Sequence, residues 1–104
     1  MGRKVKYNYF FKGKGFKTDK RVSSFKGEPN TNLDRYDKRN GKFVSRRKFD
    51  NIGNAVKDYD VSDLHKKYDH VHDIIGFNRD TNDRVPTKKE SKEIKKAKKE
   101  RRFW

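Results

Sequence analysis

The sequence contains no cysteine, and this absence excludes several kinds of chemistry. Without thiols, the chain can form no disulfide, no thiolate zinc site and no cysteine nucleophile. It also contains no apolar run of the length that a bilayer-spanning helix needs. The charged start, residues 1–6, leads into only a short aromatic stretch, which differs from the apolar region of a secretory signal. We therefore expect a cytoplasmic protein that does not engage a membrane.

Apolar residues are scarce, since hydrophobic side chains make up only 29% of the 104 residues. Leu, Ile, Val and Phe together form about a fifth of the chain, which is close to the composition at which chains stop folding unaided. Eight Phe, five Tyr and one Trp favour folding, because each large ring buries much apolar surface. The length allows one small domain. We expect a small folded centre with loosely attached, highly charged ends.

Acidic residues are outnumbered by basic ones: the chain has 15 Asp and Glu and 30 Lys and Arg, which gives a formal net charge of +15. Residues 1–26 carry +8 and residues 77–104 carry +6, whereas residues 27–76 are almost balanced at +1. We expect a basic N-terminal arm with one strand over 1–26, a folded β core over 27–76, a linker over 77–86 and a basic helix over 87–104. Such a surplus favours a polyanionic partner, above all nucleic acid, either RNA or DNA.

Turn residues divide the middle of the chain into short β-strands. Asn40-Gly41 is a strong hairpin signal, because both residues tolerate the positive φ that a type I′ turn requires. A second turn surrounds Gly53, after which residues 55–61 return as another strand. With a short helical segment near residues 62–69, these signals predict an α+β fold: a small antiparallel β-meander with a basic C-terminal α-helix.

Two-residue alternation along these strands sorts their side chains onto two faces. The face expected to form the core contains Tyr36, Phe43, Phe49, Ala55, Tyr59 and Val61. On the other face, the expected registers place Arg35, Arg46 and Asp58 in one cross-strand row. Such a row is either a surface ion-pair ladder or part of a phosphate site. Arg35, Arg46 and Arg47 are therefore candidate nucleic-acid ligands.

The loop after the first aromatic stretch, Lys12-Gly13-Lys14-Gly15, alternates lysine with glycine. Backbone N–H groups and ammonium charges in such a loop can hold a phosphate. A Gly-x-Gly pair without a following helix is a weak motif, and a plain basic turn is the alternative. We keep Lys12 and Lys14 as candidate nucleic-acid ligands.

A capping box, Thr87-Lys88-Lys89-Glu90, predicts a helix that continues to Arg102. Its apolar interior residues are Ile94 and Ala97, which are too few to bury a face, so we expect a helix that does not serve packing. It is either a solvated tail or an element that lies along a phosphate backbone. Its candidate nucleic-acid ligands are Lys88, Lys89, Lys92, Lys95, Lys96 and Lys99.

All three histidines lie within residues 65–72, in a segment that is rich in aspartate. His70 and His72 are two residues apart, so on an extended strand they point to the same side. His65 joins them only if the intervening loop folds back. One interpretation is acid–base cleavage of RNA, in which one imidazole takes the proton of the 2′-OH and another gives a proton to the leaving 5′ oxygen. Arginines would then stabilise the phosphate charge.

Two other interpretations of this segment stay open. Three histidines and an aspartate are an acceptable ligand set for zinc or a related ion, although their spacing matches no strong metal motif. Alternatively, the segment is a polar loop whose charges pair with the surplus lysines. Between the two chemical interpretations, the sequence favours proton transfer, so we expect no cofactor and keep a divalent metal at the His/Asp cluster as the other option.

Several segments of the middle of the chain form a recurring pattern: Gly27-Glu28-Pro29-Asn30, Tyr36, Gly41-Lys42, Arg46-Arg47-Lys48-Phe49-Asp50, Gly53, Ala55, Asp58, Asp60, His65 and His70-Val71-His72-Asp73. The pattern resembles small C-terminal domains of bacterial polymorphic toxins, which also end some phage minor head proteins. The resemblance covers about residues 27–73. The basic N-terminal arm and the Lys-rich helix lie outside it.

Such toxin domains are generally presumed to be nucleases, often RNases. The resemblance implies catalysis by His65, His70, His72, Asp58 and Asp60, with Arg46 or Arg47 as phosphate ligand. It also implies a protein partner, either an immunity-type protein or a virion component. We therefore predict a small basic phage- or prophage-type protein that binds nucleic acid in the bacterial cytoplasm or in a virion, with toxin-like RNA cleavage as the sharper hypothesis. The alternatives are a non-enzymatic virion or head-associated structural protein and an adaptor for an acidic protein surface.

Overall fold

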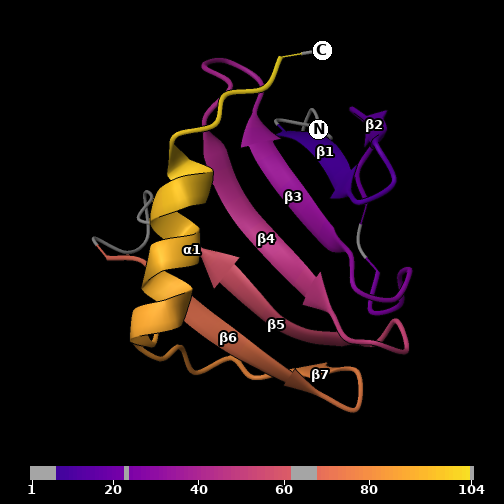
Figure 1. Ribbon diagram of the computed structural model, residues 1–104, viewed down its shortest axis with the longest axis vertical. Coiled ribbons are helices and arrows are strands. Elements are labelled where there is room, and N and C mark those ends of the chain that lie inside the picture. The colour runs from indigo at the N-terminus through magenta and orange to yellow at the C-terminus, as the bar shows by residue number, and fades with distance from the viewer. Residues whose placement is uncertain (1–6, 23, 62–67, 104) are drawn as a thin grey trace, which may run out of the picture.

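The computed structural model describes residues 7–22, 24–61 and 68–103. In these ranges, seven antiparallel strands form one sheet in the order β2-β1-β3-β4-β5-β6-β7, and one helix lies across a face of the sheet (Figure 1). The elements are β1 (Tyr7–Lys12), β2 (Phe16–Thr18), β3 (Asn32–Asp37), β4 (Phe43–Phe49), β5 (Ala55–Asp60), β6 (His70–Ile75), β7 (Asn78–Arg79) and α1 (Lys88–Lys98). This small α+β fold confirms the predicted class. The helical segment expected near residues 62–69 falls mainly outside the described residues.

Strand β1 lies inside the sheet, between β2 and β3. It pairs with β3 along its whole length, from Tyr7 opposite Asp37 to Lys12 opposite Asn32. The turn into β2 contains Gly13, whose φ of 107° is a conformation that glycine adopts without strain. Residues 7–12 of the expected basic arm are therefore held by a full strand ladder rather than loosely attached.

The strand registers differ from those expected for the row of Arg35, Arg46 and Asp58. Arg35 lies opposite Ser45, whereas Arg46 lies opposite Asp34 on one side and Tyr59 on the other. The expected row is therefore wrong. The physical reason is that the register shifts at two irregularities in the β3–β4 and β4–β5 ladders, and one extra residue in a strand reverses the faces beyond it.

The buried apolar side chains form two clusters, one on each face of the sheet. The cluster beneath α1 contains Phe10, Tyr36, Phe43, Tyr59, Val61, Val71, Ile94 and Ala97. The cluster on the other face contains Tyr9, Leu33, Phe49, Ala55 and Ile74. All six residues expected in the core are buried, but Phe49 and Ala55 belong to the second cluster because they follow the shifted register.

Helix α1 packs against the sheet, so the expectation that packing is not its purpose is wrong. Thr87 caps the helix as the sequence predicts: its side chain accepts the N–H of Glu90, whose carboxylate accepts the N–H of Thr87. Ile94 and Ala97 are only 1% and 2% exposed. Two apolar residues suffice because acidic side chains on the same side of the helix pair with cations of the sheet.

Arg46 occupies the centre of this helix–sheet interface. Its guanidinium donates to both oxygens of Asp34 at 2.7 and 3.0 Å and to Glu93 Oε2 at 3.0 Å. The side chains of Arg46 and Asp34 are 5% and 0% exposed. Glu93 also accepts from Lys48 Nζ at 2.8 Å and from the hydroxyl of Tyr59 at 3.0 Å. The buried charges are therefore fully paired, which is the condition under which burying them is tolerated.

Glu90 is the second buried carboxylate of this interface. It accepts from Arg84 Nη1 at 2.7 Å and Nη2 at 2.9 Å, and from Lys57 Nζ at 2.8 Å. These hydrogen bonds, above all those from Arg84, hold the pKa of Glu90 well below its usual range. Arg84 also bonds Asp73 and holds the pKa of that carboxyl below its usual range.

Replacing one partner of the Arg46 pair tests the buried charge. Asp34→Asn should lower the free energy of unfolding by about 3 kcal/mol, because the buried guanidinium loses one of its two compensating carboxylates. Denaturant unfolding at neutral pH measures the change. The matched control, Asp34→Leu combined with Arg46→Met, should recover much of the loss because it leaves neither partner of the pair as an unpaired charge. Wild-type stability in Asp34→Asn alone would contradict this account.

The lowered pKa of Glu90 predicts how stability depends on pH. Its ordinary value is 4.5 and its folded value is lower, so its contribution is fully present above pH 4.5 and is lost as pH falls below that value. The part of the unfolding free energy that Glu90 contributes should be level from pH 7 to about 5.5 and decline below pH 4.5. Glu90→Gln should lose roughly 2–4 kcal/mol at pH 7 and show a shallower acid decline. An equally steep decline in Glu90→Gln would assign the acid sensitivity to other carboxyls.

Candidate functional site

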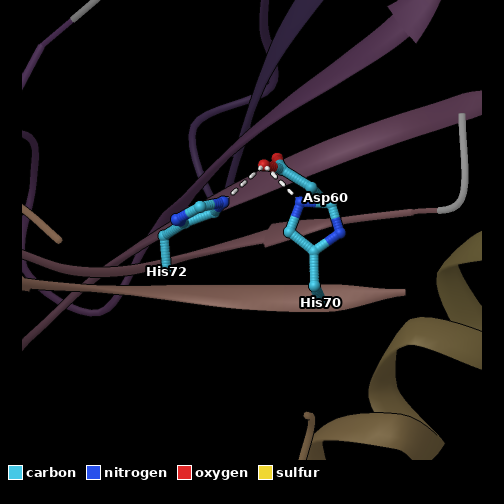
Figure 2. Close-up of side chains that lie close together, drawn as sticks. All are labelled: Asp60, His70 and His72. Carbon is cyan, nitrogen blue, oxygen red and sulfur yellow. Dashed lines mark ion pairs between the residues drawn. The ribbon is translucent and has the colours of Figure 1, made fainter. Parts of the chain in front are cut away.

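The face of the sheet opposite α1 carries the predicted catalytic residues of β5 and β6, which are Asp58, Asp60, His70 and His72. In the β5–β6 ladder, Asp60 lies opposite His70 and Asp58 lies opposite His72. Residues two apart on a strand share a face, so both ladder pairs point to the same side. Figure 2 shows the imidazoles of His70 and His72 on one side of β6, both directed toward Asp60 of β5.

Three of the predicted catalytic residues, Asp60, His70 and His72, therefore meet in one cluster. His70 Nε2 lies 3.4 Å and His72 Nε2 lies 3.7 Å from Asp60 Oδ2. The two rings are nearly perpendicular, with centroids 5.0 Å apart. Both imidazoles are buried, at 5% and 8% exposure for His70 and His72. The fourth predicted residue, His65, lies outside the described residues.

The second nitrogen of each imidazole faces a backbone carbonyl. His72 Nδ1 lies 2.8 Å from the carbonyl oxygen of Asp80, and His70 Nδ1 lies 3.3 Å from that of Tyr68. A carbonyl oxygen only accepts, so each Nδ1 carries the proton and donates. These contacts fix the orientation of the rings and leave the Nε2 atoms directed at Asp60.

Asp58, the fifth predicted catalytic residue, is held by two arginines. Arg47 donates to its two oxygens at 2.7 and 2.8 Å, and Arg79 Nε donates to Oδ2 at 2.7 Å. Burial raises the pKa of Asp58, but the hydrogen bonds from Arg47 and Arg79 outweigh it and keep the pKa below its usual range. Asp58 therefore remains a carboxylate and positions the arginines. Arg79 also donates to Asp60 Oδ2 at 2.9 Å, which joins Asp58 to the cluster.

A pocket of about 180 Å³ opens beside the cluster. It is lined by Tyr9, Arg21, Val22, Leu33, Arg35, Ser45, Arg47, Asp58, Asp60 and Arg79. Four arginines and two aspartates give this lining a positive balance. Asp60 belongs both to the wall of the pocket and to the cluster, whereas His70 and His72 are not among the lining residues.

Two arginines of the pocket are available to an anion. Arg35 donates through Nε to Ser45 Oγ at 2.7 Å and stacks 4.7 Å above the ring of Tyr7. Within the described ranges, neither Arg35 nor Arg21 forms an ion pair with a carboxylate. By contrast, Arg47 donates hydrogen bonds to Asp58 and to the carbonyl of Ser24. Among the arginines of the pocket wall, Arg35 and Arg21 are therefore the two without a carboxylate partner in the described residues.

Arg46 lies on the other face of the sheet, buried beneath α1, so the prediction that it is a phosphate ligand is wrong. Arg21 and Arg79 were not predicted from the sequence. Arg79 belongs to a strand of two residues, which is too short to show an alternation pattern. Arg21 follows the β2 strand in the basic arm, where only its proximity to Arg35 in space distinguishes it from its neighbours.

The predicted lysines of α1 lie on the outer side of the helix, away from the cluster. All six are exposed: Lys88, Lys89, Lys92, Lys95, Lys96 and Lys99. None of them forms an ion pair with another described residue. Lys12 and Lys14 are different, because they pair with Glu100 at 3.3 Å and with Glu28 at 2.9 Å. Figure 1 shows α1 lying on one face of the sheet. The exposed lysines are therefore on that side, and the pocket and its cluster are on the opposite face.

Comparison with known proteins gives no match to a family model, to a curated protein or to a solved structure. Among the described residues, no helix combines the length and the apolar composition that crossing a membrane requires.

Proposed function

We propose that the protein binds the phosphate backbone of nucleic acid. The observation that carries this proposal is the lysine surface, the six exposed lysines of α1 and its C-cap Lys99 that have no carboxylate partner in the described ranges: Lys88, Lys89, Lys92, Lys95, Lys96 and Lys99. Each lysine placed against a phosphate releases condensed counterions, which favours binding at low salt. An acidic protein surface is the alternative partner, and the experiment below separates the two.

The acidic residues of the helix explain why this surface is so one-sided. Glu90 and Glu93 point toward the sheet, where they pair with Arg84, Lys57, Arg46 and Lys48. Both glutamates of α1 are therefore held in ion pairs, and the exposed side chains of the helix are all lysines. Because the sheet holds the helix in place, binding does not have to order it, which reduces the entropy cost of association.

Removing three charges from the lysine surface tests the binding proposal. The variant Lys92→Gln, Lys95→Gln, Lys99→Gln should bind duplex or single-stranded nucleic acid more weakly than wild type. Its slope of log affinity against log salt should fall by about 2–3, because each lost phosphate contact removes about 0.7–0.9. Fluorescence anisotropy with a labelled oligonucleotide from about 50 to 200 mM salt measures both quantities.

The matched control removes the same charge around the edge strand β2, with Lys17→Gln, Lys20→Gln and Lys38→Gln; Lys38 follows β3 and pairs with Asp19 just after β2. This control should keep most of the salt slope if contact on α1, rather than net charge, determines binding. Equal slopes in the two variants would reject the lysine surface as the binding site. Pull-downs with and without nuclease treatment address the adaptor alternative: a partner retained after nuclease treatment, without binding to purified RNA or DNA, would replace the proposal.

A second function, cleavage of RNA, is favoured by the position of the cluster beside the pocket. Arg35 and Arg21 offer donors to a phosphate in the pocket, and Asp60 links that position to His70 and His72. In the proposed step, the 2′ oxygen of RNA attacks phosphorus and loses its proton, the bond from phosphorus to the 5′ oxygen breaks, and that oxygen gains a proton. The products are a 2′,3′-cyclic phosphate and a 5′-hydroxyl. The sequence resemblance of about residues 27–73 to small C-terminal domains of bacterial polymorphic toxins, presumed to be nucleases, points to the same hypothesis.

Cleavage and binding should be separable because they lie on opposite faces of the sheet. His70→Ala combined with His72→Ala should abolish cleavage of a short RNA and leave its binding unchanged. The lysine variant described above should cut the same RNA at a wild-type rate once the substrate is saturating. Gel analysis of a labelled oligoribonucleotide, with a 2′-deoxy version as the uncleavable control, measures the rate. Wild-type protein that never cuts RNA, or equal cutting by the histidine variant, would leave binding as the function.

A further inference from the structure

The geometry points to a divalent metal site formed by Asp60, His70 and His72, of the kind that takes zinc or a related first-row transition ion. One ligand atom from each residue lies within 4.8 Å of the others. Two imidazole nitrogens and one carboxylate oxygen are ligands that such ions prefer. The inference deepens the proposed RNA cleavage by identifying what the cluster holds, but it is tested without RNA.

The hydrogen-bond polarity of the histidines is the first argument for an ion. The Nδ1 atoms of both rings face carbonyl oxygens, so they carry the protons. In the neutral rings, the Nε2 lone pairs then point at Asp60, whose carboxylate oxygen also only accepts. Three acceptors directed at one another repel, whereas a cation between them attracts all three. Nδ1 donation to a backbone carbonyl is also the usual second contact of a metal-bound histidine.

Asp60 Oδ2 also accepts a hydrogen bond from Arg79 Nη2 at 2.9 Å. An ion in the site would therefore share this carboxylate with Arg79, whose hydrogen bond fixes the orientation of the carboxylate as the carbonyl contacts fix the two rings.

The distances are the second argument. Charge-assisted hydrogen bonds between nitrogen and oxygen are typically about 2.7–2.9 Å long. The separations from Asp60 Oδ2 are 3.4 Å to His70 Nε2 and 3.7 Å to His72 Nε2, which are too long for such bonds. Ligand atoms around a tetrahedral zinc ion with bonds of about 2.0–2.1 Å lie about 3.3 Å apart. The observed spacing therefore resembles a ligand set more closely than an ion pair.

Three protein ligands leave at least one coordination position for water or substrate. Asp60 is the residue that the site shares with the pocket, where Arg35 and Arg21 offer donors to an anion. A bound ion would supply Lewis-acid stabilisation to a phosphate oxygen there. His70 and His72 then act as metal ligands rather than as proton-transfer groups, which differs from the acid–base interpretation that the sequence favoured.

Titration of metal-free protein with Zn²⁺ tests the site directly. Isothermal titration calorimetry should show one equivalent bound by wild type, and Co²⁺ should give the visible absorption of an ion with nitrogen and oxygen ligands. The variants His70→Gln and His72→Gln should each bind at least about 100-fold more weakly, since even losing an outer-shell partner of a metal ligand costs 10–100-fold. Asp60→Asn should weaken binding in the same direction.

The matched control is Asp73→Asn, which removes a carboxylate from the same strand, where Asp73 pairs with Arg84. It should keep wild-type Zn²⁺ affinity. Because the histidine variants are buried and can lose stability, thermal unfolding is measured with and without Zn²⁺: wild type and Asp73→Asn should gain melting temperature, and the histidine variants should not. No stoichiometric binding by wild type, or equal binding by His70→Gln combined with His72→Gln, would overturn the site.

Failure of the metal site and failure of RNA cleavage give different results. RNA cutting that persists after chelator treatment, in protein that binds no Zn²⁺, rejects the metal and keeps the cleavage. Stoichiometric Zn²⁺ binding that depends on both histidines, in protein that cuts no RNA, keeps the metal site and rejects the cleavage.

Discussion

The contact of Arg46 with Asp34 and Glu93 holds the helix on the sheet, and the rest of the structure depends on it. With so few apolar residues, the helix–sheet interface cannot be closed by hydrophobic burial alone. Ion pairs that are complete and hydrogen-bonded take the place of part of that core. The arrangement demands that every charge keep its partner, because a single unpaired group in this layer is costly.

The same interface creates the functional asymmetry of the protein. Because the glutamates of α1 are directed inward to the cations of the sheet, the outward side of the helix is left with lysine. The opposite face of the sheet is free of the helix and carries the pocket and the cluster of Asp60, His70 and His72. Packing therefore places a cationic surface on one side of the sheet and the pocket with its His/Asp cluster on the other.

On the cluster face, the arginines divide into two groups that do different work. Arg47 and Arg79 neutralise and position the aspartates, whereas Arg35 and Arg21 retain donors that can reach an anion. The histidines are oriented from behind by backbone carbonyls. A metal ion on Asp60, His70 and His72, with a phosphate beside it on Arg35 and Arg21, would join the proposed metal site to the proposed cleavage.

Local patterns in the sequence determined the α+β class, the cap at Thr87, and the shared side of His70 and His72, because each depends on residues within a few positions of one another. They did not determine which face Arg46 occupies, since a one-residue register shift reverses a strand and is set by the neighbouring strands. Nor did they reveal that Glu90 and Glu93 anchor α1, or that Arg21 and Arg79 reach the pocket. Those contacts join residues that are distant in the chain, so only the tertiary structure decides them.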